Sequence, residues 1–186
     1  MKSKNISRIQ GENINLCTFR TDEEAIELYH KWVNEEEILH FISKHNKVIS
    51  LREEIEWANS KHKDYRFNIV DRKTDTLIGN CDITLTPDCG RNASLGIVIG
   101  DNNFRNKGYG TEVIKLLIKF AFEEIGVHRV HLTLNGDNER AHKCYLKSGL
   151  KDEGVLREAI YHKGKYSDLL YMGILEKEYF ENKKEG

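Results

Sequence analysis

Proline is almost absent from this sequence of 186 residues, which contains it only at Pro87. No segment rich in proline, serine and glycine interrupts the chain as an interdomain linker would, and no segment is repeated. The hydrophobic fraction of 39% and the charged fraction of 32% are typical of a soluble globular protein. Because this length suffices for one substantial core, we expect a single domain over residues 1–186.

Long apolar runs and an excess of charge of one sign are also missing. No run approaches the roughly 20 apolar residues that cross a bilayer. The N-terminal segment MKSKNISRIQ has basic residues without the apolar core of a secretory signal. The 29 Lys and Arg residues nearly balance the 30 Asp and Glu residues, so no global basic field attracts nucleic acid. This balance does not exclude a local basic patch. We therefore expect a cytoplasmic protein with no membrane partner and no direct nucleic-acid partner.

The four cysteines, Cys17, Cys81, Cys89 and Cys144, include no C-x-x-C pair. None of the eight histidines lies at zinc-finger spacing from them. Free cysteine packs as a small hydrophobic residue in a reducing compartment. We therefore predict free thiols and no metal site.

Hydrophobic periodicity predicts a succession of strands and helices. Helices are expected over 21–33, 51–58, 111–125 and 138–148, and strands over 13–19, 65–70, 76–86, 93–99, 129–134, 155–160 and 167–174. Thr21 with Glu24, and Ser50 with Glu53, have the spacing of helix-capping boxes. The segments 34–47 and 87–92 are expected to be irregular.

The connections between these elements predict the topology. The strands from 65 to 99 are joined by turns of about five residues, which are too short for a parallel crossover, so they should be antiparallel. Strand 93–99, helix 111–125 and strand 129–134 form a βαβ unit, so those two strands should be parallel neighbours. The expected fold class is α/β (α+β), with a mixed, mostly antiparallel central sheet flanked by helices.

The segment LGIVIGDNNFRNKGYGT, residues 95–111, indicates a phosphate site. A strand ends, a short loop bends, and a helix begins at Gly108 or Gly110. Glycine lets backbone N–H groups approach a ligand, and a helix start favours a diphosphate through its free amides and positive dipole end. The loop has neither the spacing of a nucleoside-triphosphate loop nor that of a dinucleotide fold. The alternative interpretation is a plain strand–turn–helix connection.

Two motifs in this order resemble the GNAT superfamily of N-acetyltransferases. The first is R-x-x-G-x-G at Arg105–Gly110, which grips the pyrophosphate of acetyl-CoA in that superfamily. The second is N-x-x-[AS]-x-x-x-Y-x-K-x-G-[FL], found at Asn138–Leu150. The segments 29–34 and 78–79 also look like the branch of ribosomal-protein-alanine N-acetyltransferases and polyamine acetyltransferases. The resemblance covers most of the chain.

The resemblance implies an acetyl-CoA site in a slot where strand 93–99 splays away from strand 129–134. Its expected cosubstrate-binding residues are Ile97, Val98, Ile99, Arg105, Asn106, Lys107, Gly108, Tyr109, Gly110, Thr111, Asn138 and Lys147. Backbone groups of 97–99 would pair with the pantetheine amides like an added strand. Asn138 would bind the pantetheine arm, cap its helix, or do both. Residues 63–175 would form the acetyl-CoA-binding core, 1–62 the acceptor side, and 176–186 a C-terminal tail.

Tyr145 is expected to protonate the leaving thiolate, because a phenol keeps its proton at neutral pH and can donate it. The alternative interpretation is a tyrosine packed between helix and sheet. Many relatives carry a glutamate as general base in an A-E-x-G pattern, and Ser94 occupies the matching position here. Asp82 could instead relay a proton through water. The sequence therefore does not identify the general base.

The acceptor is expected to be a primary amine, such as a protein N-terminal amine, with a polyamine or another small amine as the alternative. Glu35, Glu36 and Glu37 could attract a cationic amine, or they could simply be solvated. The amine should enter between 34–42 and the turn 161–166, the longest irregular segments near the slot. A non-catalytic CoA-binding sensor is an alternative function. The sequence does not exclude a homodimer.

Overall fold

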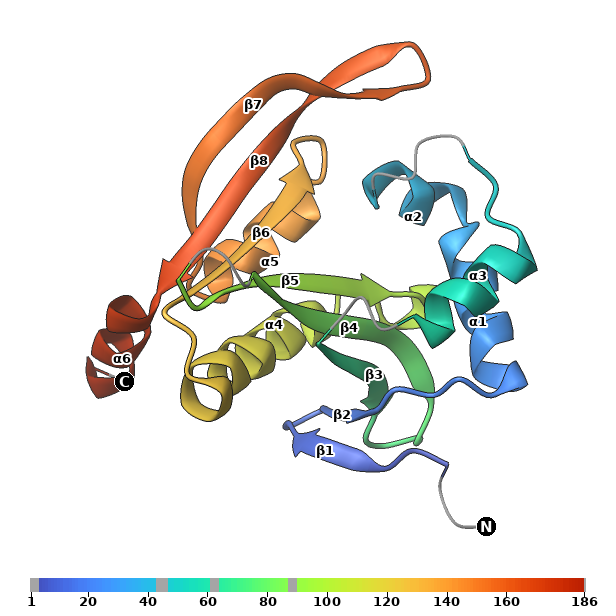
Figure 1. Cartoon of the computed structure of the whole chain (residues 1–186), viewed down its shortest axis with the longest axis horizontal. Helices are drawn as coiled ribbons and strands as arrows, with labels where there is room; N and C mark the ends of the chain where they lie inside the picture. The colour runs from blue at the N-terminus through green and yellow to red at the C-terminus, as the bar shows by residue number, and fades with distance from the viewer. Residues whose placement is uncertain (1–3, 43–46, 61–63, 87–89, 186) are drawn as a thin grey trace.

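The computed structural model describes residues 4–42, 47–60, 64–86 and 90–185, which form one eight-stranded sheet with helices packed on it (Figure 1). The strands are β1 (Ser7–Gln10), β2 (Ile14–Thr18), β3 (Tyr65–Asp71), β4 (Leu77–Thr86), β5 (Asn92–Ile99), β6 (Arg129–Asn135), β7 (Lys151–His162) and β8 (Lys165–Leu175). The helices are α1 (Glu23–Val33), α2 (Glu36–Phe41), α3 (Leu51–Asn59), α4 (Tyr109–Phe120), α5 (Glu139–Lys147) and α6 (Glu176–Glu185). A π-helical turn over Ala121–Ile125 continues α4.

The strand order is β1-β2-β3-β4-β5-β6-β8-β7, and every neighbouring pair is antiparallel except β5 and β6. The crossover through α4 makes that pair parallel, because a chain that leaves one end of a sheet through a helix returns in the same direction. The predicted fold class is therefore confirmed.

Strands β5 and β6 pair over only part of their length. Their register runs from Asn92 opposite Arg129 to Ser94 opposite His131 and then stops. Strand β4 pairs with β5 as far as Ile99, and β8 pairs with β6 as far as Asn135. The facing edges of β5 and β6 beyond Ser94 therefore diverge, which is the predicted slot.

Side chains of the central strands alternate between two buried layers. One layer includes Ile69 and Leu95 and packs against Leu117 of α4. The other includes Val70 and packs against Tyr29 of α1, together with residues of α2 and α3. The sheet thus separates a face covered by α4 from a face covered by α1–α3 (Figure 1).

Three elements differ from the sequence prediction. Part of the segment expected to be irregular, 34–47, forms α2, while residues 43–46 lie outside the described part. Strand β1 was not predicted, and it pairs with β2 at the sheet edge. The expected C-terminal tail forms α6, where Tyr179 stacks on Phe122 and its hydroxyl donates to Glu123 at 2.6 Å. Of the predicted loop 87–92, residues 87–89 are not described and Asn92 already belongs to β5.

The start of α1 corrects the predicted capping box. The N-cap is Asp22 rather than Thr21, and its carboxylate accepts a hydrogen bond from the Ala25 amide at 3.4 Å. The hydrogen bonds of the Arg20 guanidinium lower the pKa of this carboxyl to about 2 and fix it at the helix start. The second predicted box is confirmed at Ser50, the N-cap of α3.

Cys17 and Cys81 are buried free thiols, and Cys144 is a partly buried free thiol. Burial raises the pKa of Cys17 to about 11. The predicted thiol at Cys89 lies outside the described residues. Within the described ranges, no cluster of histidine, cysteine, aspartate and glutamate has a metal-binding arrangement, and no helix is long and apolar enough to span a membrane.

Candidate active site

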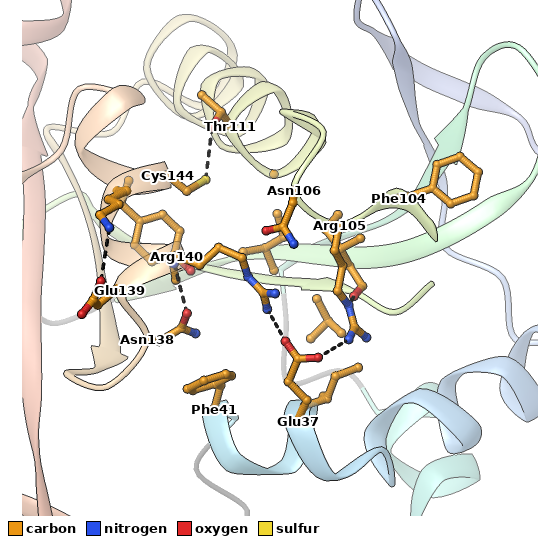
Figure 2. Close-up of a pocket in the computed structure, with 18 of the residues that line it drawn as sticks. Glu37, Phe41, Phe104, Arg105, Asn106, Thr111, Asn138, Glu139, Arg140 and Cys144 are labelled. Atoms are coloured by element: carbon orange, nitrogen blue, oxygen red, sulfur yellow. Dashed lines mark hydrogen bonds and ion pairs between the residues drawn. The ribbon is translucent and has the colours of Figure 1, made fainter. Parts of the chain in front are cut away.

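A cavity of about 590 Å³ opens where β5 and β6 diverge. Such a volume is typical of sites for small molecules and cofactors. The predicted cosubstrate residues that line it are Ile97, Val98, Ile99, Arg105, Asn106, Gly108, Gly110, Thr111, Asn138 and Lys147, and the predicted acid Tyr145 lines it as well. Figure 2 shows side chains from the β5–α4 loop, α4, α5 and α2 converging on this space. The structure therefore brings together most of the predicted site.

The start of α4 supplies the polar end of the cavity. Gly108 is the N-cap, with a left-handed φ of 86°, and a Cβ added there would meet no atom within 4 Å. The first α4 hydrogen bond runs from the Glu112 amide to the Gly108 carbonyl. The amides of the first turn, from Tyr109 to Thr111, thus lack helical acceptors. With the dipole of a helix start they can bind a phosphate group.

The Arg105 side chain lies between the end of β5 and α2. Its guanidinium donates to the carbonyls of Ile99 at 2.9 Å and Gly100 at 2.8 Å, and its side chain is only 6% exposed. It also forms ion pairs with Glu35 at 3.1 Å and Glu37 at 2.9 Å. The arginine that the motif assigned to pyrophosphate therefore fastens α2 to the end of β5.

Two of the predicted cosubstrate-binding residues do not line the cavity. Lys107 lies exposed in the loop. The Tyr109 hydroxyl donates to Asp71 of β3 at 2.8 Å, so its phenol joins α4 to the sheet. Tyr109 can therefore contribute its backbone amide, but not its side chain, to a ligand at the helix start.

One face of α5 forms the opposite wall. Asn138 caps this helix by accepting a hydrogen bond from the Ala141 amide at 3.0 Å, which confirms the capping role. Arg140 and Cys144 line the cavity although neither was predicted in the site. The spacing from Arg140 to Cys144 is four residues and that from Cys144 to Lys147 is three, so these positions share a helix face, which could have been recognised from the sequence.

Tyr145 lies in this wall against the core. Burial, with a smaller contribution from Cys144, raises the pKa of its phenol above the ordinary value. None of the described residues forms a hydrogen bond with its hydroxyl. The phenol is therefore protonated at neutral pH and keeps its donor for a ligand.

Helix α2 covers the cavity through Ile38 and Phe41. Its three neighbouring acids are all in ion pairs. Glu35 and Glu37 contact Arg105, Glu37 also contacts Arg140, and Glu36 contacts Lys163 at the tip of the β7–β8 hairpin. The His40 ring lies 4.5 Å from the His162 ring of the same hairpin. The two segments that were expected to flank the amine entrance therefore contact each other through these side chains.

Asp82 lies on the α1–α3 face of the sheet rather than in the cavity wall. Its β5 neighbour is Gly96, where an added Cβ would lie 2.6 Å from the Asp82 Oδ2 atom. Leu95 and Ile97 point toward α4, so Gly96 faces the other way. The missing side chain of Gly96 thus leaves space for a carboxylate just beyond Ser94, the last β5 residue paired with β6.

Comparison with known proteins agrees with this geometry. The model of the acetyltransferase (GNAT) domain family matches residues 13–151. An uncharacterized N-acetyltransferase, p20, of Bacillus licheniformis is 26% identical over 88% of this chain and 87% of its own. Spermidine N(1)-acetyltransferase of Vibrio cholerae is 27% identical over 68% of this chain and 75% of its own.

Solved structures show the same fold. The crystal structure of spermidine N-acetyltransferase from Vibrio cholerae in complex with CoA and spermine superposes with a TM-score of 0.79. That alignment covers 90% of this chain and 98% of the other, at 23% identity. The family match extends over the slot, the α4 start and α5. The chain therefore belongs to the GNAT family of acetyl-CoA-dependent N-acetyltransferases.

Proposed function

We propose that this enzyme acetylates a primary amine on a small cationic molecule, with acetyl-CoA as donor. The observation that carries the proposal is the slot between β5 and β6, which has phosphate-binding amides at one end and the Asp82 carboxylate on the opposite face of the sheet. Relatives named for spermidine favour a small amine. The sequence resemblance to ribosomal-protein-alanine N-acetyltransferases favours a protein N-terminal amine as second candidate.

The unpaired edge of β5 would hold the pantetheine arm. Free backbone groups of 97–99 can pair with its two amides as an added strand does, and the α4 start would receive the pyrophosphate. Asn138 uses its side-chain oxygen on the helix cap, so its amide N–H groups remain for the arm. Orienting two reactants in this way is worth up to ~7–11 kcal/mol of the barrier.

In the chemical step, the amine nitrogen attacks the thioester carbonyl. The N–C bond forms, the C–S bond breaks, and sulfur leaves as a thiolate that takes the Tyr145 proton. The backbone N–H groups near Val98 can stabilise the charge that develops on the carbonyl oxygen. The proton lost by the amine passes to Asp82 through a water.

We expect Asp82→Asn to lower kcat/KM for the amine about tenfold and to leave KM for acetyl-CoA unchanged. The estimate is below the usual range for general-base catalysis, because water can take part of the role. Ser94→Ala is the matched control on the neighbouring strand and should change kcat/KM less than about twofold. Steady-state kinetics with each substrate varied in turn measures both. Equal kcat/KM in the wild type and Asp82→Asn would remove Asp82 from the proton path.

An acetyl-CoA consumption screen against polyamines, aminoglycosides and N-terminal peptides tests the proposed acceptor. The expected result is turnover with at least one small cationic amine, at a kcat/KM above that for every peptide. Preference for a peptide would establish the second candidate. Tight acetyl-CoA binding without turnover of any amine would favour a CoA-binding sensor.

A further inference from the structure

Glu37 connects two arginines across the mouth of the cavity. Its Oε2 atom lies 2.9 Å from Arg105, and its Oε1 atom lies 2.8 Å from Arg140. Figure 2 shows Arg140 extending from α5 toward Glu37 on α2, and Asn106 is drawn among the same lining residues. All four side chains line the cavity that acetyl-CoA would enter.

The two arginines differ in how firmly they are held. The Arg105 side chain is 6% exposed and is also bound by two main-chain carbonyls of the β5 end. The Arg140 side chain is 45% exposed and meets Glu37 at the cavity rim. A partly exposed ion pair of this kind contributes little stability, so little free energy opposes a change of partner. Arg105 is thus fixed, whereas Arg140 can change partner.

A carboxylate in this position opposes the expected ligand. The phosphates of acetyl-CoA are anions, and like charges at an interface disfavour binding. Arg140 lies in the first turn of α5, on the helix face that also presents Cys144 and Lys147 to the cavity. Arginine is well suited to bind phosphate, because its planar fork of N–H donors matches two oxygens.

We propose that Arg140 binds a phosphate of acetyl-CoA and that Glu37 is its internal competitor, holding Arg140 until the cosubstrate displaces it. The inference rests on the proposed use of acetyl-CoA in this cavity. On binding, Arg140 leaves Glu37 Oε1 for a phosphate oxygen, while Glu37 Oε2 stays on Arg105. Arg105 is then a positioning residue that keeps α2 over the cavity during the exchange.

Binding of acetyl-CoA to Glu37→Gln tests the proposal, since this substitution removes the competing charge and keeps the side-chain shape. The expected dissociation constant is about threefold to fivefold lower than that of the wild type, as the measured strength of exposed ion pairs suggests. Arg140→Gln should bind about tenfold more weakly, because a charged hydrogen bond to phosphate is lost. The double variant should behave like Arg140→Gln. Glu36→Gln is the matched control on the same helix, and it should leave acetyl-CoA affinity unchanged.

Acetyl-pantetheine, which has no phosphate of the CoA nucleotide, separates competition from a change in shape. Neither the Glu37→Gln gain nor the Arg140→Gln loss should appear with this probe. An unchanged or weaker acetyl-CoA affinity in Glu37→Gln, or a gain that persists in the double variant, would overturn the proposal. If Glu37→Gln does not fold, equal acetyl-CoA affinity of Arg140→Gln and the wild type would overturn it instead. Failure of the wild type itself to bind acetyl-CoA would refute the proposed function.

Discussion

Replacing Tyr145 by phenylalanine is expected to lower kcat by about 10²–10⁴-fold while acetyl-CoA affinity stays nearly unchanged, the range typical of general acid catalysis. The substitution removes one hydroxyl from a ring that still packs in the cavity wall. Burial raises the pKa of this phenol, so its proton is present before reaction and can meet the negative sulfur as the C–S bond breaks. The loss should therefore appear in the chemical step.

A packing tyrosine would give the opposite pattern. Its removal would leave kcat normal and change stability little, because none of the described residues forms a hydrogen bond with the hydroxyl. Tyr179→Phe is a suitable control, because its hydroxyl donates to Glu123 in the π-helical turn after α4, and neither residue lines the cavity. Measuring kcat and the thermal midpoint for both variants separates catalysis from stability. Full activity in Tyr145→Phe would contradict the acid role and leave the fold and the cosubstrate site standing.

The parts of the fold that depend on neighbouring residues could be predicted from the sequence. The crossover from β5 through α4 to β6 follows from short-range periodicity and from the geometry of parallel pairing. The cap of α3 at Ser50 also depends on residues within one turn. The α4 start could be predicted because a glycine and a change of periodicity occur together at Gly108.

The parts of the fold that depend on distant residues could not be predicted from the sequence. Helix α2 is six residues long, too short to be stable alone. Its acids are held by Arg105, Arg140 and Lys163, which lie far along the chain. Local propensity in 34–47 carries no information about those partners, so an irregular segment was the reasonable expectation. The edge strand β1 has only four residues, three of them exposed, and so leaves an equally weak pattern.

The same limitation affected the site. A motif identifies which residues are present, but the direction of a long side chain depends on what surrounds it. Arg105 matched a phosphate-binding pattern, and in the structure its guanidinium contacts two carbonyls and two carboxylates. Arg140 had no motif assignment, although it faces the cavity. We therefore expect substitution of Arg105 to affect mainly stability and substitution of Arg140 to affect mainly acetyl-CoA binding.

Arg105→Ala is expected to destabilise the fold by about 2 kcal/mol and to lower the thermal midpoint by roughly 4–8 °C. The substitution leaves the carbonyls of Ile99 and Gly100 without their guanidinium donor and separates two carboxylates from their cation. Breaking a fully buried pair costs about 3–5 kcal/mol. The smaller value applies here because Glu35 is 26% exposed and Glu37 is 47% exposed, so water can solvate both acids.

Thermal unfolding without ligand, beside acetyl-CoA titration at a temperature where the variant is folded, measures the two effects separately. Arg105→Lys should recover only part of the stability, since one ammonium cannot replace a planar fork that contacts four acceptors. Lys151→Ala is the control for an exposed ion pair, with Glu178 at 2.5 Å, and should cost less than about 1 kcal/mol. A direct pyrophosphate contact would instead give an unchanged midpoint and a large loss of acetyl-CoA affinity. That result would return Arg105 to the role that its motif predicts, and the α2 contacts would then be incidental to stability.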